Sequence, residues 1–161
     1  MSETGQKVSI IMVDDDEDDC LIIKEALAES ELDYNLTVFE SGLELLDYLH
    51  GRGKYAGIQI KSPDLILLDL YMPEMSGMNV LKEIKEDPEL RPLDIVVLTD
   101  STEWSELSKC YQLGATAVFS KEQWLQTFAD LIRISGPYWF KFVTFKVSNG
   151  SKPGSGRRPW R

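Results

Sequence analysis

The 161-residue sequence is poor in cysteine and histidine, which argues against a disulfide scaffold and against a metal site built from thiol and imidazole groups. Its two cysteines, Cys20 and Cys110, fall inside amphipathic patterns and not in a CxxC pair. We therefore expect them to be buried, reduced thiols. The single histidine, His50, closes an apolar helix pattern, where a surface or helix-capping role is expected rather than catalysis or metal ligation.

Positive charge is also scarce, because 17 Lys and Arg stand against 27 Asp and Glu and give a net charge of -10. Nucleic acids and anionic membranes are bound through basic patches, so we expect neither as a partner and favour proteins or cations. No apolar run approaches the roughly 18 residues of a membrane span, and the polar start MSETGQK does not resemble a signal peptide. We expect a cytoplasmic protein.

Glycine-rich nucleotide loops are missing as well. Gly51 and Gly53 follow a helical pattern and not a strand, so the GRG stretch is not a dinucleotide fingerprint. The connection that contains it, residues 51–63, is longer than usual, and we expect it to be mobile rather than to bind a ligand.

Five short apolar runs alternate with five stretches of helical period, which predicts an α/β fold with a parallel sheet wrapped by helices. The predicted strands are residues 7–13, 34–39, 64–69, 94–99 and 116–119. The third and fourth are apolar on both faces, as central parallel strands should be. Ser41 is a candidate N-cap, and Gly114 stands where a left-handed helix C-cap is expected. Trp104 and Trp124 open helices and are expected to be packing residues rather than binding residues.

The chain is predicted to divide into a folded domain over residues 1–135, an aromatic extension over 136–147 and a disordered tail over 148–161. The extension, GPYWFKFVTFKV, has strand propensity. It either covers its own core or forms a self-complementary dimer contact, and we favour the dimer. We expect no output domain after residue 147.

Polar side chains follow four of the predicted strands. Asp14 and Asp15 follow the first strand, Asp69 ends the third, Thr99 ends the fourth and Lys121 follows the fifth. In a doubly wound sheet, ligands gather at the carboxyl ends of the strands. Three carboxylates brought together there would repel one another, and a hard divalent cation relieves that repulsion. Mg²⁺ fits best, because it takes one or two carboxylates and leaves positions for water or phosphate oxygens.

With a cation in place, Asp69 is a plausible nucleophile toward phosphorus, giving an aspartyl phosphate. The cation would contact one phosphoryl oxygen, the Thr99 hydroxyl a second and the Lys121 ammonium a third. An EF-hand, with Asp14, Asp16, Asp18 and Glu25 as ligands, fails because Asp19 stands at the position that requires glycine. Residues 16–19 are expected to form a solvated first helical turn.

Four stretches, MVDD, LILLDLYMPEMSG, VVLT and FSK, occur in this order and together resemble the signature blocks of response-regulator receiver domains over residues 8–134. The resemblance implies the flavodoxin-like strand order 2-1-3-4-5 with five helices. It implies that Asp69 is the phosphoacceptor, that Asp15 binds magnesium directly and Asp14 through water, and that the Tyr71 backbone carbonyl is a further ligand. Thr99 and Lys121 would contact the phosphoryl group. The MPEMSG turn contains Gly77, where the family's glycine suits an unusual backbone angle.

The long loop after the second helix and the ending PYWFKFVTF are similar to the single-domain response regulators that partner bacterial phytochromes. This implies a sensor histidine kinase as phosphodonor, with a bacterial phytochrome as candidate, a homodimer, and output through protein contact. The chain would not be an enzyme beyond its own phosphorylation and slow dephosphorylation. It departs from the family at Glu122, where a proline is usual, at Val118, where an aromatic residue is usual, and at Asp100, where a small residue is commoner.

Two other hypotheses remain. The chain could be a receiver-like scaffold that is never phosphorylated. A metal-dependent phosphatase on a related sheet is less favoured, because Tyr71 stands where such an enzyme needs a second acid.

Overall fold

The protein is described here by a computed structural model covering residues 7–30 and 32–135. The predicted extension (136–147) and tail (148–161) lie outside the described residues. The strands are β1 (Val8–Val13), β2 (Tyr34–Phe39), β3 (Leu65–Asp69), β4 (Ile95–Thr99) and β5 (Ala117–Ser120). They form one parallel sheet in the order β2-β1-β3-β4-β5, which confirms the predicted flavodoxin-like order. Every predicted strand boundary is within one residue of the observed one.

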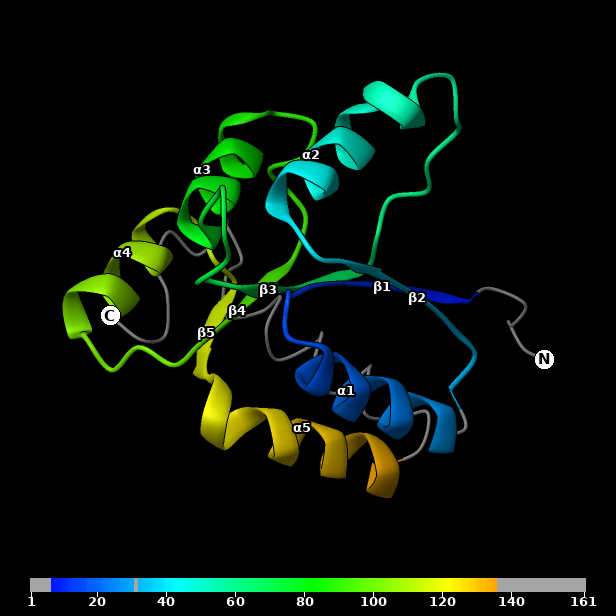
Figure 1. Ribbon diagram of the computed structural model, residues 1–161, viewed down its shortest axis with the longest axis vertical. Coiled ribbons are helices and arrows are strands. Elements are labelled where there is room, and N and C mark those ends of the chain that lie inside the picture. Colours follow the sequence, from blue (N-terminus) through cyan, green and yellow to red (C-terminus); the bar gives the residue numbers. More distant parts are fainter. Residues whose placement is uncertain (1–6, 31, 136–161) are drawn as a thin grey trace.

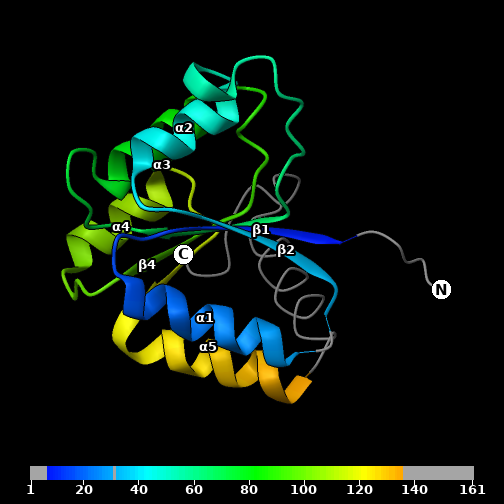
Figure 2. The same ribbon diagram turned by 45° about the vertical axis from the view of Figure 1, so that its right-hand side comes forward.

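Helices cover both faces of the sheet (Figure 1). They are α1 (Glu17–Glu29), α2 (Gly42–His50), α3 (Gly77–Glu86), α4 (Trp104–Gln112) and α5 (Lys121–Ser135), with a short 3-10 turn, η1 (Gly53–Tyr55), after α2. Helices α1 and α5 lie side by side against one face, and α2, α3 and α4 cover the other (Figures 1 and 2). Over the described residues, none of these helices is both long and apolar enough to span a bilayer.

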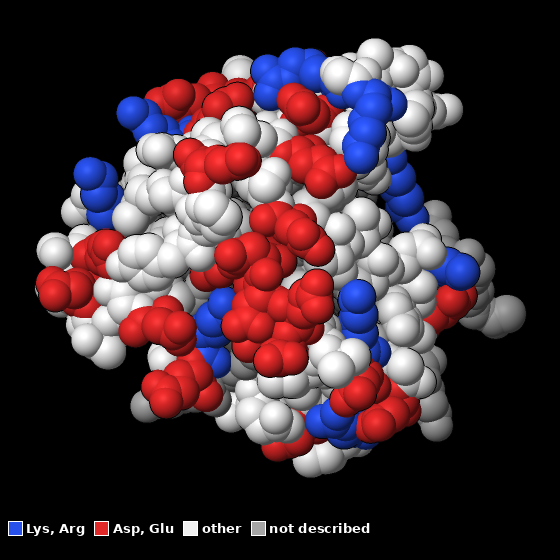
Figure 3. Space-filling view, in the orientation of Figure 1, with Lys and Arg blue, Asp and Glu red and all other residues white. Residues whose placement is uncertain are grey.

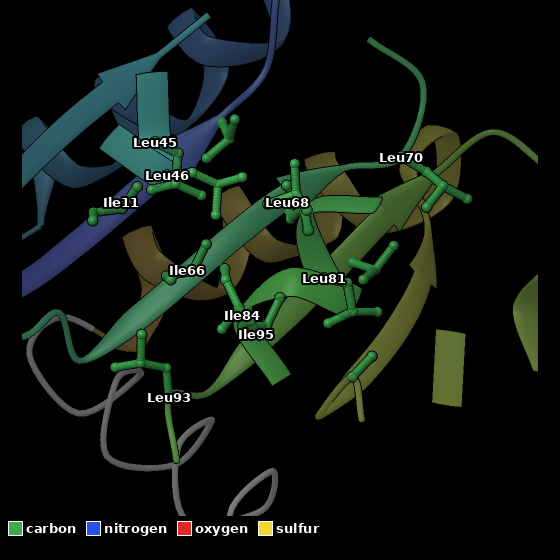
Figure 4. Packing of buried hydrophobic residues seen from close by; sticks show 14 of the residues in the cluster. Ile11, Leu45, Leu46, Ile66, Leu68, Leu70, Leu81, Ile84, Leu93 and Ile95 are labelled. Carbon is green, nitrogen blue, oxygen red and sulfur yellow. The ribbon is translucent and has the colours of Figure 1, made fainter. Parts of the chain in front are cut away.

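Two hydrophobic layers hold the sheet between the helices. Alternate residues of β1 enter opposite layers, with Ile10 and Met12 facing α1 and α5, and Ile11 and Val13 facing α2 and α3. All residues of β3 and β4 are buried, as predicted for strands that are apolar on both faces. Figure 4 shows the second layer, where leucine and isoleucine side chains from the strands meet those of α2 and α3. Each such side chain contributes roughly 1.5 to 3 kcal/mol through burial.

Two predicted helix caps are confirmed. The Ser41 hydroxyl accepts a hydrogen bond from the Glu44 amide at the start of α2. Gly114 follows α4 with φ of +108°. The packing role predicted for Trp104 is wrong, because its side chain at the start of α4 is 73% exposed. The Trp124 side chain lies outside the part of the chain that the structure describes.

Gly77 is required for a different reason from the one predicted. It is the first residue of α3 and does not have positive φ, whereas Glu74 in the preceding turn does, at +71°. A Cβ atom at Gly77 would lie 2.2 Å from the backbone oxygen of Asp69. Only glycine lets α3 start against the end of β3, so Gly77 fixes the loop that follows Asp69.

The long connection after α2 starts with a packed turn. The ring of Tyr55 contacts the rings of Phe39 and Tyr48, and its hydroxyl donates a hydrogen bond of 2.8 Å to Glu44. These contacts attach η1 to β2 and α2. The mobility predicted for this connection stays a prediction for the residues beyond Tyr55.

Candidate functional site

Strand register brings the predicted site residues to one edge of the sheet. Val13 of β1 pairs with Leu68 of β3, so the next residues, Asp14 and Asp69, are neighbours. On the other side of β3, Asp69 pairs with Leu98 of β4, which precedes Thr99. Thr99 in turn pairs with Ser120 of β5, and Lys121 follows. Four strand ends thus deliver the polar side chains, as parallel strands in this order require.

The three predicted acids form a compact group. Asp14, Asp15 and Asp69 each offer a carboxylate oxygen, and these oxygens lie within 4.8 Å of one another. Asp14 and Asp69 are only 1% and 5% exposed, whereas Asp15 is exposed. Asp14 Oδ1 accepts a hydrogen bond from the Asp16 amide at 2.9 Å, and Asp69 Oδ1 accepts one from the Tyr71 amide at 3.2 Å.

Burial disfavours the charged form of Asp14 and Asp69 and so raises the pKa of both. It raises the pKa of Asp69 to about 7, with a further rise from the Asp14 charge that Lys121 and the Tyr71 amide oppose. Burial also raises the pKa of Asp14, against the hydrogen bond from the Asp16 amide and the charge of Lys121. The buried Oδ2 of Asp14 makes no well-aligned hydrogen bond, and its neighbour is the Lys121 ammonium. A group of oxygen donors with this excess of negative charge suits a hard divalent cation such as Mg²⁺.

Lys121 is the cation at the centre of the site. It is 8% exposed, and its Nζ lies 2.8 Å from Asp19, 2.9 Å from Asp14 and 3.3 Å from Asp69. Burial acts to lower the pKa of Lys121, but the close contacts with the Asp19 and Asp14 carboxylates and the charge of Asp69 more than offset it and raise the pKa above its usual value. The lysine is therefore charged and held by three carboxylates.

Asp19 is the residue that the sequence interpretation missed, since it was placed in a solvated turn. Its side chain is 20% exposed and forms the shortest of the Lys121 contacts. The signal was the helical period: Asp19 stands four residues before the buried Ile23 and next to the buried Cys20, so it lies at the edge of the buried face of α1. The other part of the prediction holds, because Asp16 caps α1 by accepting from the amides of Asp18 and Asp19.

Thr99 lies at the site, but its hydroxyl is hydrogen-bonded to the loop that follows β4. Its side chain is fully buried, and its Oγ1 accepts a hydrogen bond of 3.0 Å from the Ser101 amide. The residues that line the cleft over the acids are Asp15, Asp16, Glu17, Asp18, Asp69, Tyr71, Asp100 and Lys121. Acidic side chains gather in the middle of the face shown in Figure 3. The structure thus joins the three acids with Lys121, and it directs the Thr99 hydroxyl to the loop that follows β4.

The two thiols and the imidazole of the described residues do not line the cleft over the acids. Cys20 and Cys110 are free and buried, as predicted, and burial raises the pKa of both thiols to about 11. His50 lies at the end of α2, where its ring nitrogens are 3.7 Å from Glu83 and 3.6 Å from Asp87. This position agrees with the structural role expected for it.

Comparison with known proteins finds relatives that match most of the chain. Residues 10–133 match the family model of the response regulator receiver domain. The chain is 31% identical over 146 residues to the response regulator Rcp1 of Synechocystis, covering 91% of this chain and 98% of Rcp1.

Solved structures of similar proteins have the same fold. The phosphorylated cyanobacterial phytochrome response regulator RcpA superimposes with a TM-score of 0.73 at 32% identity, over 84% of this chain and 95% of RcpA. The Mn²⁺-bound form of Rcp1 gives a TM-score of 0.71 at 30% identity, over 82% of this chain and 94% of that one.

Proposed function

Because the chain belongs to the response regulator receiver domain family, we propose that it is a stand-alone response regulator whose Asp69 accepts a phosphoryl group from a sensor histidine kinase. The observation that carries this proposal is the position of Asp69, which lies between two further acids and a buried ammonium 3.3 Å away. A carboxylate in that position has both a place for a metal ion and a donor for an incoming phosphoryl oxygen.

We assign the metal to Mg²⁺, held by Asp15, Asp69 and the backbone carbonyl of Tyr71, with Asp14 acting through water. A bound divalent cation would neutralise the acids and stabilise negative charge on a phosphoryl oxygen. The fit rests on the three clustered carboxylates and on the buried Asp14 oxygen without a well-aligned hydrogen bond. The Mn²⁺-bound relative supports a divalent ion in this fold.

In the proposed reaction, a carboxylate oxygen of Asp69 attacks the phosphorus atom, and the bond from phosphorus to the donor nitrogen breaks. The nitrogen keeps the electron pair of that bond. Lys121 donates a hydrogen bond to one phosphoryl oxygen, which requires its ammonium to shift from Asp69 toward the new group. Thr99 donates to another oxygen after its hydroxyl turns away from the Ser101 amide.

The Thr99 movement connects the chemistry to signalling. Its hydroxyl now holds the first turn of the β4–α4 loop, so a phosphoryl group that attracts the hydroxyl releases that loop. The two packings of this loop would then be biased by phosphorylation, and α4 would change its surface. We propose that output is by protein contact and that the kinase is of the phytochrome type, which the similarity to Rcp1 and RcpA supports.

The proposed domain organisation follows the sequence: a receiver domain over 1–135, a dimer-forming extension over 136–147 and a tail over 148–161. The family match, which covers residues 10–133, supports the first of these boundaries.

Incubation with Mg²⁺ and acetyl phosphate tests the proposal. We expect an acid-stable, base-labile phosphoryl adduct on the wild-type chain and none on Asp69→Asn. Asp33→Asn is a matched control, because it removes a carboxylate just before β2 that is far from the site and pairs only loosely with Lys7, at 4.0 Å. Equal labelling of wild type and Asp69→Asn would remove Asp69 as the acceptor.

A scaffold without phosphorylation is the second candidate. It is favoured by Asp100, which lines the cleft and adds negative charge where most receivers have a small residue. Mg²⁺ affinity that did not change in Asp15→Asn and Asp69→Asn would support the scaffold over the phosphoacceptor.

A further inference from the structure

The contact between Asp19 and Lys121 joins two helices that lie side by side. Asp19 belongs to the first turn of α1, and Lys121 is the first residue of α5. These two helices run side by side on one face of the sheet (Figures 1 and 2). Their charged atoms are 2.8 Å apart, which is closer than Lys121 is to Asp14 or Asp69. Since the lysine is 8% exposed, water screens this contact little.

Asp19 differs from the other two lysine partners in what else it does. Asp14 and Asp69 belong to the group of acids that could hold a metal ion, and Asp19 does not. When a cation and a phosphoryl group engage Asp14 and Asp69, Lys121 loses two of its three partners in part or completely. The contact with Asp19 remains, because none of its atoms is needed for either ligand.

We propose that Asp19 is a positioning residue that keeps the Lys121 ammonium beside Asp69 while the metal and the phosphoryl group bind. This inference rests on the proposed function of Asp69. A lysine side chain is long and flexible, and an ammonium without a fixed partner samples many rotamers or follows the nearest acid. The nearest remaining acid here is Asp14, at 2.9 Å, so a released lysine would compete with the cation for that carboxylate.

The backbone gives Asp19 a fixed position from which to act. Its amide lies 3.4 Å from Asp16 Oδ1 in the helix cap, and the adjacent Cys20 is buried against the sheet. The Cys20 thiol also donates a hydrogen bond of 3.7 Å to the Asp14 backbone oxygen. The turn that carries Asp19 is thus tied to the residue that starts the site.

The test compares Asp19→Asn with Asp18→Asn. Both remove one negative charge from the same helical turn, but Asp18 makes no contact with Lys121 within the described structure. The rate of phosphorylation by acetyl phosphate is measured against Mg²⁺ concentration for each. Removing a direct transition-state donor costs about 100- to 1000-fold in rate, and losing only its positioning should cost less. We expect Asp19→Asn to lower the rate at saturating Mg²⁺ about tenfold below Asp18→Asn. We also expect it to need more Mg²⁺ for half-saturation, because the released ammonium competes with the cation for Asp14.

A double-mutant cycle separates positioning from a structural role. In a Lys121→Met background, Asp19→Asn should cause no further fall in rate, because the group that it positions is gone. An equal fall in both backgrounds would overturn the proposal, as would equal saturating rates for Asp19→Asn and Asp18→Asn. Wild-type protein that takes up no phosphoryl group would instead refute the proposed function.

If Asp19→Asn does not fold, Asp19→Glu provides the same test. It keeps the charge but moves the carboxylate by one methylene. When Lys121 is present, we expect Asp19→Glu to be phosphorylated more slowly at saturating Mg²⁺ than Asp18→Glu. In the Lys121→Met protein, we expect the two glutamate variants to have the same rate. Identical rates for the two glutamate variants would overturn the positioning role.

Discussion

The hydroxyl of Tyr71 donates a hydrogen bond to the carboxylate of Glu106, which joins the loop after β3 to the first turn of α4. Tyr71 is the second residue after Asp69, and its amide also donates to the Asp69 carboxylate. One residue thus contacts both the candidate phosphoacceptor and the helix proposed to change its surface. This hydrogen bond raises the pKa of the Tyr71 phenol above its usual value.

Glu106→Gln should remove most of the rise in the pKa of the Tyr71 phenol. The main cause of the raised pKa is the hydrogen bond to the Glu106 carboxylate, which favours the protonated phenol. Ultraviolet titration of Glu106→Gln, with Tyr71→Phe used to assign the signal, should show Tyr71 losing its proton at lower pH than in wild type. Tyr71 is about half exposed, at 53%, so we expect Tyr71→Phe to cost less than about 1 kcal/mol in unfolding free energy. An unchanged phenol titration would show that the contact does not form in solution.

Asp69→Asn should stabilise the metal-free protein at alkaline pH. The folded pKa of Asp69, about 7, is above its unfolded value of 3.8, so the folded state binds this proton more tightly. The corresponding stability is complete below about pH 4 and is lost as the pH rises through 7. The substitution removes that loss, and we expect a gain of about 1 to 3 kcal/mol at pH 8 that shrinks toward pH 4. Urea unfolding with chelator at several pH values measures this gain. If the unfolding free energies of wild type and Asp69→Asn change with pH in the same way, the raised pKa of Asp69 is wrong.

Magnesium should stabilise the wild-type chain against unfolding. A ligand at 100 times its Kd, bound only by the folded state, contributes about 2.7 kcal/mol. Asp15→Asn removes an exposed member of the acid group, so it should need at least about tenfold more Mg²⁺ for the same rise in Tm. Asp33→Asn, remote from the site, should respond as wild type does. Equal responses in Asp15→Asn and wild type would exclude Asp15 as a ligand.

Gly77→Ala should destabilise the fold. The added Cβ would lie 2.2 Å from the Asp69 backbone oxygen and 2.8 Å from Leu70 Cα. Neither backbone atom can move away without distorting the end of β3. We expect a loss of at least about 1 to 3 kcal/mol in unfolding free energy. Urea unfolding measures this, and a chain as stable as wild type would show that α3 does not start this close to β3.

Truncation after Ser135 should convert a dimer into a monomer. The reason lies in the sequence, where residues 136–147 form an apolar segment with strand propensity that is expected to self-associate. Light scattering on the full and truncated chains measures the change. If both chains have the mass of a monomer, the extension has no role in dimerisation.

The fold and most of the site could be predicted because they depend on local patterns. Apolar runs such as Leu65–Leu68 define central strands, and the polar residues after them then gather at one edge by topology alone. That Asp14 and Asp69 lie next to each other therefore follows from the strand order.

Two of the failed predictions involve contacts between segments far apart in sequence, and the third involves the face of a helix. Gly77 is fixed by the backbone of β3, which no turn pattern reveals. Asp19 is held by a lysine about one hundred positions away, and a charged residue in the first turn of a helix is usually solvated. Trp104 opens a helix whose apolar side does not include it.

The most direct test of the account is to identify the residue that carries the phosphoryl group. The wild-type chain is phosphorylated with acetyl phosphate and Mg²⁺, reduced with borohydride, which converts an aspartyl phosphate to homoserine, and digested for mass spectrometry. We predict homoserine at position 69 and nowhere else. Homoserine at Asp14, Asp15 or another aspartate, or none in the digest, would contradict the claim that Asp69 is the phosphoacceptor.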